Sequence, residues 1–442
     1  MVRRPLRLAT TEQLERSARA AGFEVHRVPD LPTRDFHRPL DERLSDGPII
    51  ADFLEKHDIE LMLDYNTEML TLLGPENGSV AHRLTNVAAG VPYVAIYLDP
   101  ITSTMGRVAW ADHWTLLENA GWIKGIFENA HAEELIRLGV SRVTKVPMGA
   151  AVDDFDTSPL PDPDPGPVVA FMGHPATSWF RSPGGVLPAH LHAGFTAAAV
   201  HADMPEVPFH TMFYDLYGFA EPPAPTDTPQ DRARKSQAYF ANKFAYNAFL
   251  AVKQRDRFAH FLKRKLGDRF ELIGDHWGPN YGLPHTPRIW DMKRLHQRMR
   301  RVPICLNLMK GNIETGLIVR HFEVTAYGGF LLTYPTPELS DFFEIGEECD
   351  VFRNEEELLQ KISFYLHHPK RRREIALAGQ RRTLGEHLYS HRITKLVETL
   401  RGSGTLRGRT GPSESGTTLP KIVVDGVPAR AAPADSNVLT GK

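Results

Sequence analysis

The sequence predicts an α/β protein with two domains, each built on a parallel, helix-covered sheet. Short apolar runs of strand length alternate with helical patterns as far as residue 147, which is typical of such a sheet. Residues 153–167 (DDFDTSPLPDPDPGP) then hold five prolines among acids, which indicates a stiff, exposed linker. The same alternation begins again at Val168. The break between two similar alternations is what indicates two domains.

The composition is that of an ordinary globular protein. Of 442 residues, 42% are hydrophobic and 24% are charged, and 52 basic residues against 54 acidic ones give a net charge of −2. No overall basic field is present to attract nucleic acid or an anionic membrane. We therefore expect no nucleic-acid partner.

Cysteine usage and the apolar runs indicate a soluble, cytoplasmic protein. Cys305 and Cys349 are the only cysteines, too few for a disulfide framework or a zinc site, which suits a reducing compartment. The N-terminal residues MVRRPLRLATTEQLERS contain no apolar core of a secretory signal. No run approaches the ~20 apolar residues of a membrane span.

The first half offers one candidate catalytic residue. Its strand over 91–98 closes on Asp99, and ligands of doubly wound sheets bind at the carboxyl ends of strands. Asp99 is therefore a candidate general base, with an ordinary Asp-Pro turn as the alternative. The sequence lacks the GxGxxG and GxxxxGK[ST] motifs of common nucleotide sites. Strands are expected over 23–28, 59–65, 91–98, 123–128 and 143–147, and helices over 11–22, 48–57, 80–89 and 130–138.

Four further candidates lie between the linker and residue 280. Gly173 and His174 follow the first strand of the second half, and Arg181 lies in the irregular stretch 175–235, to which the sequence assigns no element. Trp277 lies in a loop after the next strand, where its ring could stack on a base or a sugar. The alternatives are structural: a histidine holding a strand end, a surface arginine and a packing tryptophan.

Residues 301–335 are the most informative stretch. They predict a buried strand, a polar loop with Gly311 and Gly316, a helix that ends at Gly328-Gly329, and a second buried strand. A strand, a glycine-containing loop and a helix N-terminus together offer free backbone N–H groups to a phosphate. The expected bounds are 302–308, 310–316, 317–327 and 330–333, after helices over 245–266 and 288–301.

The charged residues of this helix suit a nucleotide sugar. Arg320 in the first turn can neutralise a diphosphate, and Glu323 can accept hydrogen bonds from ribose hydroxyls. The Gly311-to-Gly316 amides complete the predicted phosphate site, which Asn307 and Thr315 flank. The alternative is an exposed Arg/Glu pair on an ordinary helix, worth about 0.2–0.5 kcal/mol. The Asp-x-Asp of the linker is locked between prolines, so we expect no metal site and no bound cofactor.

The end of the chain is expected to be helical and then disordered. Asn354 and Glu357 form a capping box for a helix that runs to His367, and helices near 370–386 and 391–401 follow. The remaining residues are rich in Gly, Ser, Thr and Pro and predict a disordered tail.

Motifs in both halves resemble those of the spore-maturation-protein (CgeB-like) glycosyltransferases, within the two-domain GT-B class. The first-half pieces are VPYVAIYLDP, which closes on Asp99, and GVSRVTKVPMGA. The resemblance covers about two-thirds of the chain. The second-half pieces are Leu306-Asn307, R-x-FE-x-x-A-x-G-G from Arg320 to Gly329, Glu357-Leu358, His368-Pro369, and H-x-Y-x-H-R from His387 to Arg392.

The resemblance implies the GT-B architecture, in which two Rossmann-like, parallel-sheet domains face each other across a cleft. The first domain would bind the acceptor and the second the nucleotide sugar. The implied segments are 1–152 (acceptor domain), 153–167 (linker), 168–385 (donor domain, with the irregular insertion 175–235), 386–401 (a helix that crosses back) and 402–442 (tail).

The resemblance also implies the activity: transfer of a sugar from a UDP-, GDP- or TDP-sugar to a hydroxyl of a glycan, protein or small molecule. We expect the transfer to be metal-independent, because a helix N-terminus with arginines can meet the phosphate charge and the sequence offers no convincing metal-ligand cluster. Two departures leave the stereochemistry open. Thr315 stands where many retaining enzymes carry the first Glu of an E-x7-E pattern, and Leu98 replaces a family-like histidine. The alternatives are a GT-B-fold nucleotide-sugar hydrolase or epimerase, and a non-catalytic scaffold, against which the retained Arg320 and Glu323 argue.

Overall fold

The computed structural model of the chain describes most residues and leaves some segments out. The described residues are 7–10, 12–28, 40–66, 69–74, 83–101, 119–176, 198, 204, 224, 226–309 and 313–406. Two predicted site residues, Arg181 and Gly311, lie outside this set, as do most of the stretch 175–235 and the tail after residue 406.

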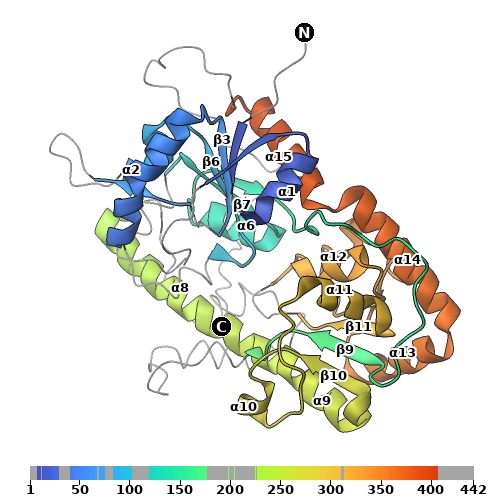
Figure 1. The fold of residues 1–442 in the computed structure, drawn as a ribbon. Helices are drawn as coiled ribbons and strands as arrows, with labels where there is room; N and C mark the ends of the chain where they lie inside the picture. The colour runs from blue at the N-terminus through green and yellow to red at the C-terminus, as the bar shows by residue number, and fades with distance from the viewer. Residues whose placement is uncertain are drawn as a thin grey trace, which may run out of the picture.

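The first domain is a six-stranded parallel sheet in the order β2-β1-β3-β6-β7-β8, with helices on its faces (Figure 1). A short antiparallel pair, β4 (Leu72–Leu73) and β5 (Arg83–Leu84), lies beside this sheet. The strands are β1 (Arg7–Thr10), β2 (Glu24–Arg27), β3 (Leu61–Tyr65), β6 (Tyr93–Ile96), β7 (Trp122–Ile126) and β8 (Val143–Lys145). The helices are α1 (Glu12–Ala20), α2 (Leu40–Lys56), α3 (Thr85–Ala88) and α6 (Asn129–Arg137).

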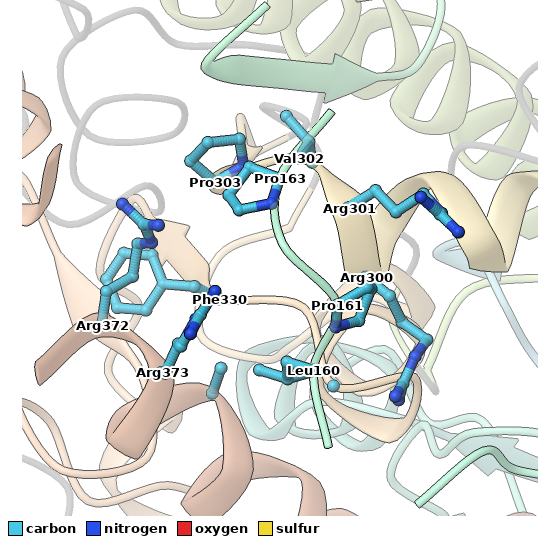
Figure 2. Close-up of a pocket in the computed structure, with 12 residues that line it drawn as sticks. Leu160, Pro161, Pro163, Arg300, Arg301, Val302, Pro303, Phe330, Arg372 and Arg373 are labelled. Carbon is cyan, nitrogen blue, oxygen red and sulfur yellow. The ribbon is translucent and has the colours of Figure 1, made fainter. Parts of the chain in front are cut away.

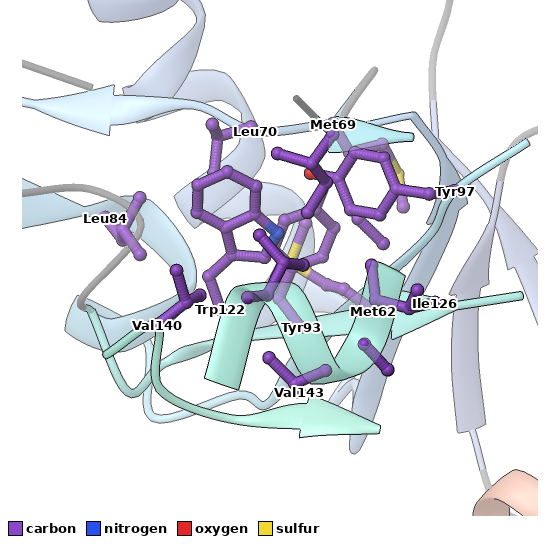
Figure 3. Packing of buried hydrophobic residues seen from close by; sticks show 14 of the residues in the cluster. Met62, Met69, Leu70, Leu84, Tyr93, Tyr97, Trp122, Ile126, Val140 and Val143 are labelled. Carbon is purple, nitrogen blue, oxygen red and sulfur yellow. The ribbon is translucent and has the colours of Figure 1, made fainter. Parts of the chain in front are cut away.

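Tyr93 and Trp122 lie side by side in the core of the first domain (Figure 3). Strands β3, β6 and β7 are buried along their whole length because helices cover both faces of the sheet, which is why they read as continuous apolar runs. The Tyr93 hydroxyl donates to Asp64 at 2.9 Å, so its polar end is satisfied inside the core.

The second domain is a five-stranded parallel sheet in the order β10-β9-β11-β12-β13. Its strands are β9 (Val169–Met172), β10 (Phe270–Ile273), β11 (Ile304–Asn307), β12 (Leu331–Thr333) and β13 (Asp350–Val351). Around the sheet are α10 (Trp277–Tyr281), α11 (Met292–Arg301), α12 (Val319–Ala326), η6 (Leu339–Asp341) and α13 (Glu355–His367). The predicted fold class, α/β with two Rossmann-like parallel-sheet domains, is confirmed.

One long helical segment runs from the first domain to the second (Figure 1). It consists of α8 (Pro229–Ala251), the π-helical turn η4 (Val252–Asp256) and α9 (Arg257–Leu266). Tyr239 and Tyr246 of α8 are buried in the core of the first domain, whereas Phe258 of α9 packs on the second sheet. The helix predicted over 245–266 is therefore only the end of a longer one. Its first part was missed because the first domain buries residues such as Tyr239, and local periodicity does not report that neighbour.

A second connection is made near the end of the described chain by α14 (Pro369–Glu386) and α15 (Tyr389–Gly402). Ile393 and Val397 of α15 are buried against the first sheet, and the backbone N–H of Tyr389 donates to the Ala150 carbonyl at 2.8 Å. None of the helices in the described ranges combines the length and the apolar content that crossing a bilayer requires.

The linker, residues 153–167, runs along the amino-terminal edge of the second sheet beside a cavity of about 20 Å³ (Figure 2). Pro303 and Phe330, which directly precede β11 and β12, line this cavity. Both acids of the linker Asp-x-Asp form ion pairs with arginines, so these acids serve to attach the linker to the second domain. The ion pairs are Arg300–Asp156 at 3.4 Å, Arg301–Asp164 at 3.1 Å and Arg373–Asp162 at 2.6 Å.

Candidate functional site

The helix predicted to carry the site, α12, begins at the carboxyl-terminal edge of the second sheet. Phe322 and Ala326 are buried against that sheet, and Arg320 and Glu323 lie on the opposite, partly exposed side, as predicted. Arg320 Nη1 lies 2.9 Å from Glu323 Oε2. This contact is not directed as a hydrogen bond, and the buried Nη1 has no hydrogen-bond partner among the described residues. A ligand can reach Arg320 only through the part of its side chain that stays exposed, because Nη1 itself is covered.

Arg255, in the π-helical turn, is a buried cation that the sequence analysis missed. Its guanidinium donates to the carbonyl oxygens of Leu308, at 3.2 Å and 3.3 Å, and of His174, at 3.2 Å. It thus ties together the loops that leave β9 and β11. Burial lowers the pKa of Arg255 to about 10, and the nearby Arg320 lowers it as well. Two neighbouring positive charges therefore lie at this edge of the sheet.

One signal in the sequence could have identified Arg255. It is three residues before Phe258 and seven before Leu262, so it shares the buried face of the predicted helix. A charged residue on an apolar helix face is rarely fully buried unless it has a specific partner or role. The π-turn around it is a second indication, because such turns are frequent at functional sites.

Asp99 lies where the sequence placed it, after β6 at the carboxyl edge of the first sheet. Its side chain is half-buried, and its negative charge raises the pKa of Arg255 in the second domain. The structure therefore brings the predicted base of one domain within electrostatic reach of the arginines of the other.

Gly173 and His174 hold the ends of β9 and β10 together. The Gly173 N–H donates to the Ile273 carbonyl at 2.9 Å, and the Asp275 N–H donates to His174 Nδ1 at 3.0 Å. The facing Gly274 permits the close approach of the two strand ends, because a Cβ on it would lie 2.4 Å from the Gly173 carbonyl oxygen. Both residues lie at the predicted edge, which Gly173 shapes through its backbone and His174 through its ring.

Trp277 does not lie in an exposed loop, so this expectation is wrong. The side chain is fully buried at the start of α10, edge-on to Phe171, and its Nε1 donates to the Gly173 carbonyl at 2.8 Å. A ring that is already covered cannot stack on a base or a sugar. Apolar neighbours in the second domain cover it, and a loop sequence does not reveal them.

Asn307 is buried as well and faces other protein groups. Its amide nitrogen lies 3.1 Å from His321 Nε2 and donates to Thr333 Oγ1 at 3.1 Å. Burial lowers the pKa of His321 to about 4, so this ring is neutral at pH 7. Asn307 therefore supports α12 through its contact with His321. In this arrangement its side chain cannot contact a nucleotide-sugar donor directly.

The loop amides predicted to bind phosphate already hold an acid of the first domain. The backbone N–H groups of Glu314, Thr315 and Gly316 donate to Glu128 Oε2 at 2.9 Å, 2.8 Å and 3.0 Å. This corrects the expectation that these amides are free for a diphosphate. The sequence correctly placed a row of loop N–H groups here, but the oxygen that they bind comes from a strand end far away in the chain.

Two further carboxylates extend this contact between the domains. Glu338 accepts from the Thr315 hydroxyl at 2.6 Å and from Lys145 of the first domain at 2.7 Å. The buried Lys243 of α8 pairs with Glu134 of α6 and, at 3.2 Å, with Glu314. Loop 313–316 is therefore held by acids and bases from three separate parts of the chain.

Oxygen, nitrogen and sulfur ligands are not gathered for a metal in the part of the chain that is described: no group of three or more His, Cys, Asp or Glu side chains is close enough. The positive charges at the carboxyl edge of the second sheet are instead those of Arg255 and Arg320. Guanidinium groups match phosphate oxygens in geometry and charge. The edge is therefore suited to an anionic, phosphate-bearing ligand.

Comparison with known proteins finds a family similarity in the second domain. The family model described as "Glycosyl transferase-like" matches residues 254–398, about a third of the chain. This segment carries Arg255, Arg320 and Glu323. A search of curated proteins finds no match.

Solved structures similar to this chain include the following three. Sucrose-phosphate synthase from Thermosynechococcus elongatus is 13% identical, with 91% of this chain and 100% of that one covered and a TM-score of 0.43. A glycosyltransferase from Rickettsia africae is 11% identical, with 90% and 98% covered and a TM-score of 0.45. HepE from Anabaena, solved in complex with UDP-glucose, is 11% identical, with 90% and 100% covered and a TM-score of 0.45.

The narrower resemblance, to the CgeB-like enzymes, stays a prediction. The second domain of this chain, from α9 to α15, is similar in sequence to glycosyltransferases.

Proposed function

We propose that the protein transfers a sugar from a nucleotide-activated donor to an acceptor hydroxyl. The observation that carries this proposal is the group at the carboxyl edge of the second sheet. Arg320 and Glu323 lie on the first turns of α12, Arg320 has a buried donor without a hydrogen-bond partner, and the buried Arg255 adds a second charge. A family model of glycosyltransferase-like proteins covers these residues.

The roles follow from the charges. Arg320 and the field of Arg255 stabilise the nucleoside diphosphate as the bond from C1 of the sugar to its phosphate oxygen breaks. Glu323 accepts hydrogen bonds from the ribose hydroxyls. The acceptor oxygen forms the new bond to C1, and its proton passes to the Asp99 carboxylate. Asp99 belongs to the first domain, which would therefore hold the acceptor.

The donor's negative charge would be met by arginine in this scheme, so we propose a metal-independent reaction. The two cysteines are buried free thiols, which suits the reducing conditions of the cytoplasm, where nucleotide sugars would be available. The nucleotide, the sugar and the class of acceptor, whether glycan, protein or small molecule, are what the experiment has to identify.

The test is to incubate the protein with UDP-, GDP- and TDP-sugars, with and without sugar and peptide acceptors, each in EDTA and in Mg²⁺ or Mn²⁺. We expect a nucleoside diphosphate to be released with an acceptor present, at the same rate in EDTA, and anomeric analysis of the product to give the stereochemistry. Release without an acceptor would favour a nucleotide-sugar hydrolase, and an altered sugar an epimerase. Binding of nucleotides without turnover would indicate a scaffold, and turnover only with metal would refute metal independence.

A further inference from the structure

Glu128 occupies an unusual position for an acid. It follows β7 of the first domain, directly before α6, and its side chain is 1% exposed. Its carboxylate oxygen Oε2 accepts the three consecutive loop N–H groups of Glu314, Thr315 and Gly316 of the second domain. If Glu128 were absent, three N–H groups at a buried interface would lose their partner.

The packing around Gly316 shows how closely loop 313–316 fits against Glu128 and Phe127 of the first domain. A Cβ on Gly316 would lie only 2.5 Å from the Cβ of Glu128 and 3.3 Å from a ring carbon of Phe127. A phosphate group does not fit between this loop and Glu128 unless the domains move apart. In this arrangement Glu128 is therefore a fixed part of the loop's surroundings.

Other contacts keep the start of α6 on the same loop. The Ala130 N–H donates to Thr315 Oγ1 at 3.1 Å, and the Asn129 N–H donates to Glu338 Oε1 at 2.7 Å. The Glu338 N–H in turn donates to the Thr315 carbonyl at 2.9 Å. The loop thus takes its shape from the first domain on one side and from η6 on the other.

We infer that Glu128 is the positioning residue for loop 313–316, so that α12 and its Arg320–Glu323 pair take their ligand-binding arrangement only when the first domain is docked on this loop. The inference deepens the proposed function and rests on it, since α12 is there the donor-binding helix. Glu128 acts through the loop and touches no reacting atom.

The charge state of Glu128 suggests how to test this role. Burial, and then the neighbouring Glu314 carboxylate, raise the pKa of Glu128 to about 8, although the three backbone N–H donors oppose the shift. At neutral pH the group is therefore mostly a neutral acid. A glutamine has the same shape, is neutral and still offers an oxygen to the three N–H groups, so Glu128→Gln should preserve the loop and Glu128→Ala should not.

The experiment compares Glu128→Ala, Glu128→Gln and a control, Glu133→Ala. The control removes an exposed acid of α6, the helix that follows Glu128. The first readout is hydrogen exchange at the 314–316 amides of the full chain. We expect exchange to become roughly tenfold faster or more in Glu128→Ala, because all three N–H groups lose their acceptor. Glu128→Gln and Glu133→Ala should exchange like the wild type.

The second readout is calorimetric titration with UDP, GDP and TDP, and with the matching nucleosides. For the diphosphate that binds, we expect Glu128→Ala to weaken affinity roughly tenfold and Glu128→Gln to restore it. Unchanged exchange in Glu128→Ala would overturn the inference. So would tighter diphosphate binding by that variant, since it would make Glu128 a competitor of phosphate.

The two readouts separate this inference from the proposed function. If the wild type binds no nucleotide, the proposed function fails, while hydrogen exchange still shows whether Glu128 orders the loop. If Glu128→Ala does not fold, Gly316→Ala serves in its place, because the added Cβ pushes the loop away from Glu128. It should also accelerate exchange at 314–316, and normal protection in a folded Gly316→Ala protein would count against the inference.

Discussion

The two edges of the second sheet both carry arginines, but the arginines have different partners. At the amino-terminal edge, Arg300, Arg301 and Arg373 each pair with an acid of the linker. The fourth arginine of that cavity, Arg372, donates to the Tyr365 carbonyl. The linker acids offset most of the arginine charge at this edge. The ion pairs attach the linker to the second domain.

At the carboxyl-terminal edge of the second sheet, fewer acids pair with the arginines. Arg255 hydrogen-bonds only to carbonyl oxygens within the described chain, and no described carboxylate forms an ion pair with it. The charge of the adjacent Asp256 raises the pKa of Arg255, but its oxygens accept from the Ala176 N–H at 2.9 Å and the Tyr281 hydroxyl at 2.5 Å. Carbonyl partners satisfy the donors of a guanidinium but leave its net charge. The two edges therefore differ in how far acids offset the arginine charge: three of the four arginines at the amino-terminal edge pair with linker acids, whereas Arg255 has carbonyl partners.

The largest expected effect is that of Arg255→Met, which removes the charge but keeps much of the volume. Diphosphate affinity should fall about a hundredfold, because both the charge and the tie between the β9 and β11 loops are lost. Affinity for the bare nucleoside should fall much less. Calorimetric titration of both ligands measures this, with circular dichroism to show that the variant is folded. Wild-type diphosphate affinity in a folded Arg255→Met protein would remove Arg255 from the site.

A smaller effect is expected from the two residues of α12. Glu323→Gln turns charge-assisted hydrogen bonds to ribose into neutral ones, which should weaken nucleotide affinity roughly ten- to a hundredfold. Arg320→Ala should weaken diphosphate binding and leave nucleoside binding almost unchanged, because the contact proposed for Arg320 is with phosphate and not with ribose. Thermal stability should hardly move in either variant, since a partly exposed i,i+3 pair contributes only tenths of a kcal/mol. If neither affinity changes, the two residues are an ordinary surface pair.

The smallest effect is expected from Arg301→Ala at the amino-terminal edge. Arg301 is half-exposed, and an exposed ion pair contributes about 0–1 kcal/mol. Nucleotide affinity should stay within about twofold of the wild type, and the melting temperature should fall by a few degrees at most. The same titration and a thermal melt measure both quantities. A large loss of affinity in this variant would show that the two edges are not separate in function.

Local patterns were sufficient for the elements of the site and insufficient for its contacts. The strand, loop and helix around Arg320 lie where periodicity and the Gly328-Gly329 stop put them. Trp277, by contrast, was assigned to a loop surface although it is buried, and the start of α8 was missed. Both errors concern neighbours from distant parts of the chain, which periodicity does not report.

The sequence by itself determined the two α/β domains, the linker between them, and the placement of Asp99, Arg320 and Glu323 at strand and helix ends. These features depend on local propensity and on which face of each element is apolar. Only the tertiary structure decided that Glu128 fills the loop amides and that Arg255 joins two strand ends. Such contacts link residues far apart in the chain, here positions 128 and 316 or 255 and 174, and no local pattern encodes which distant group will satisfy a buried donor.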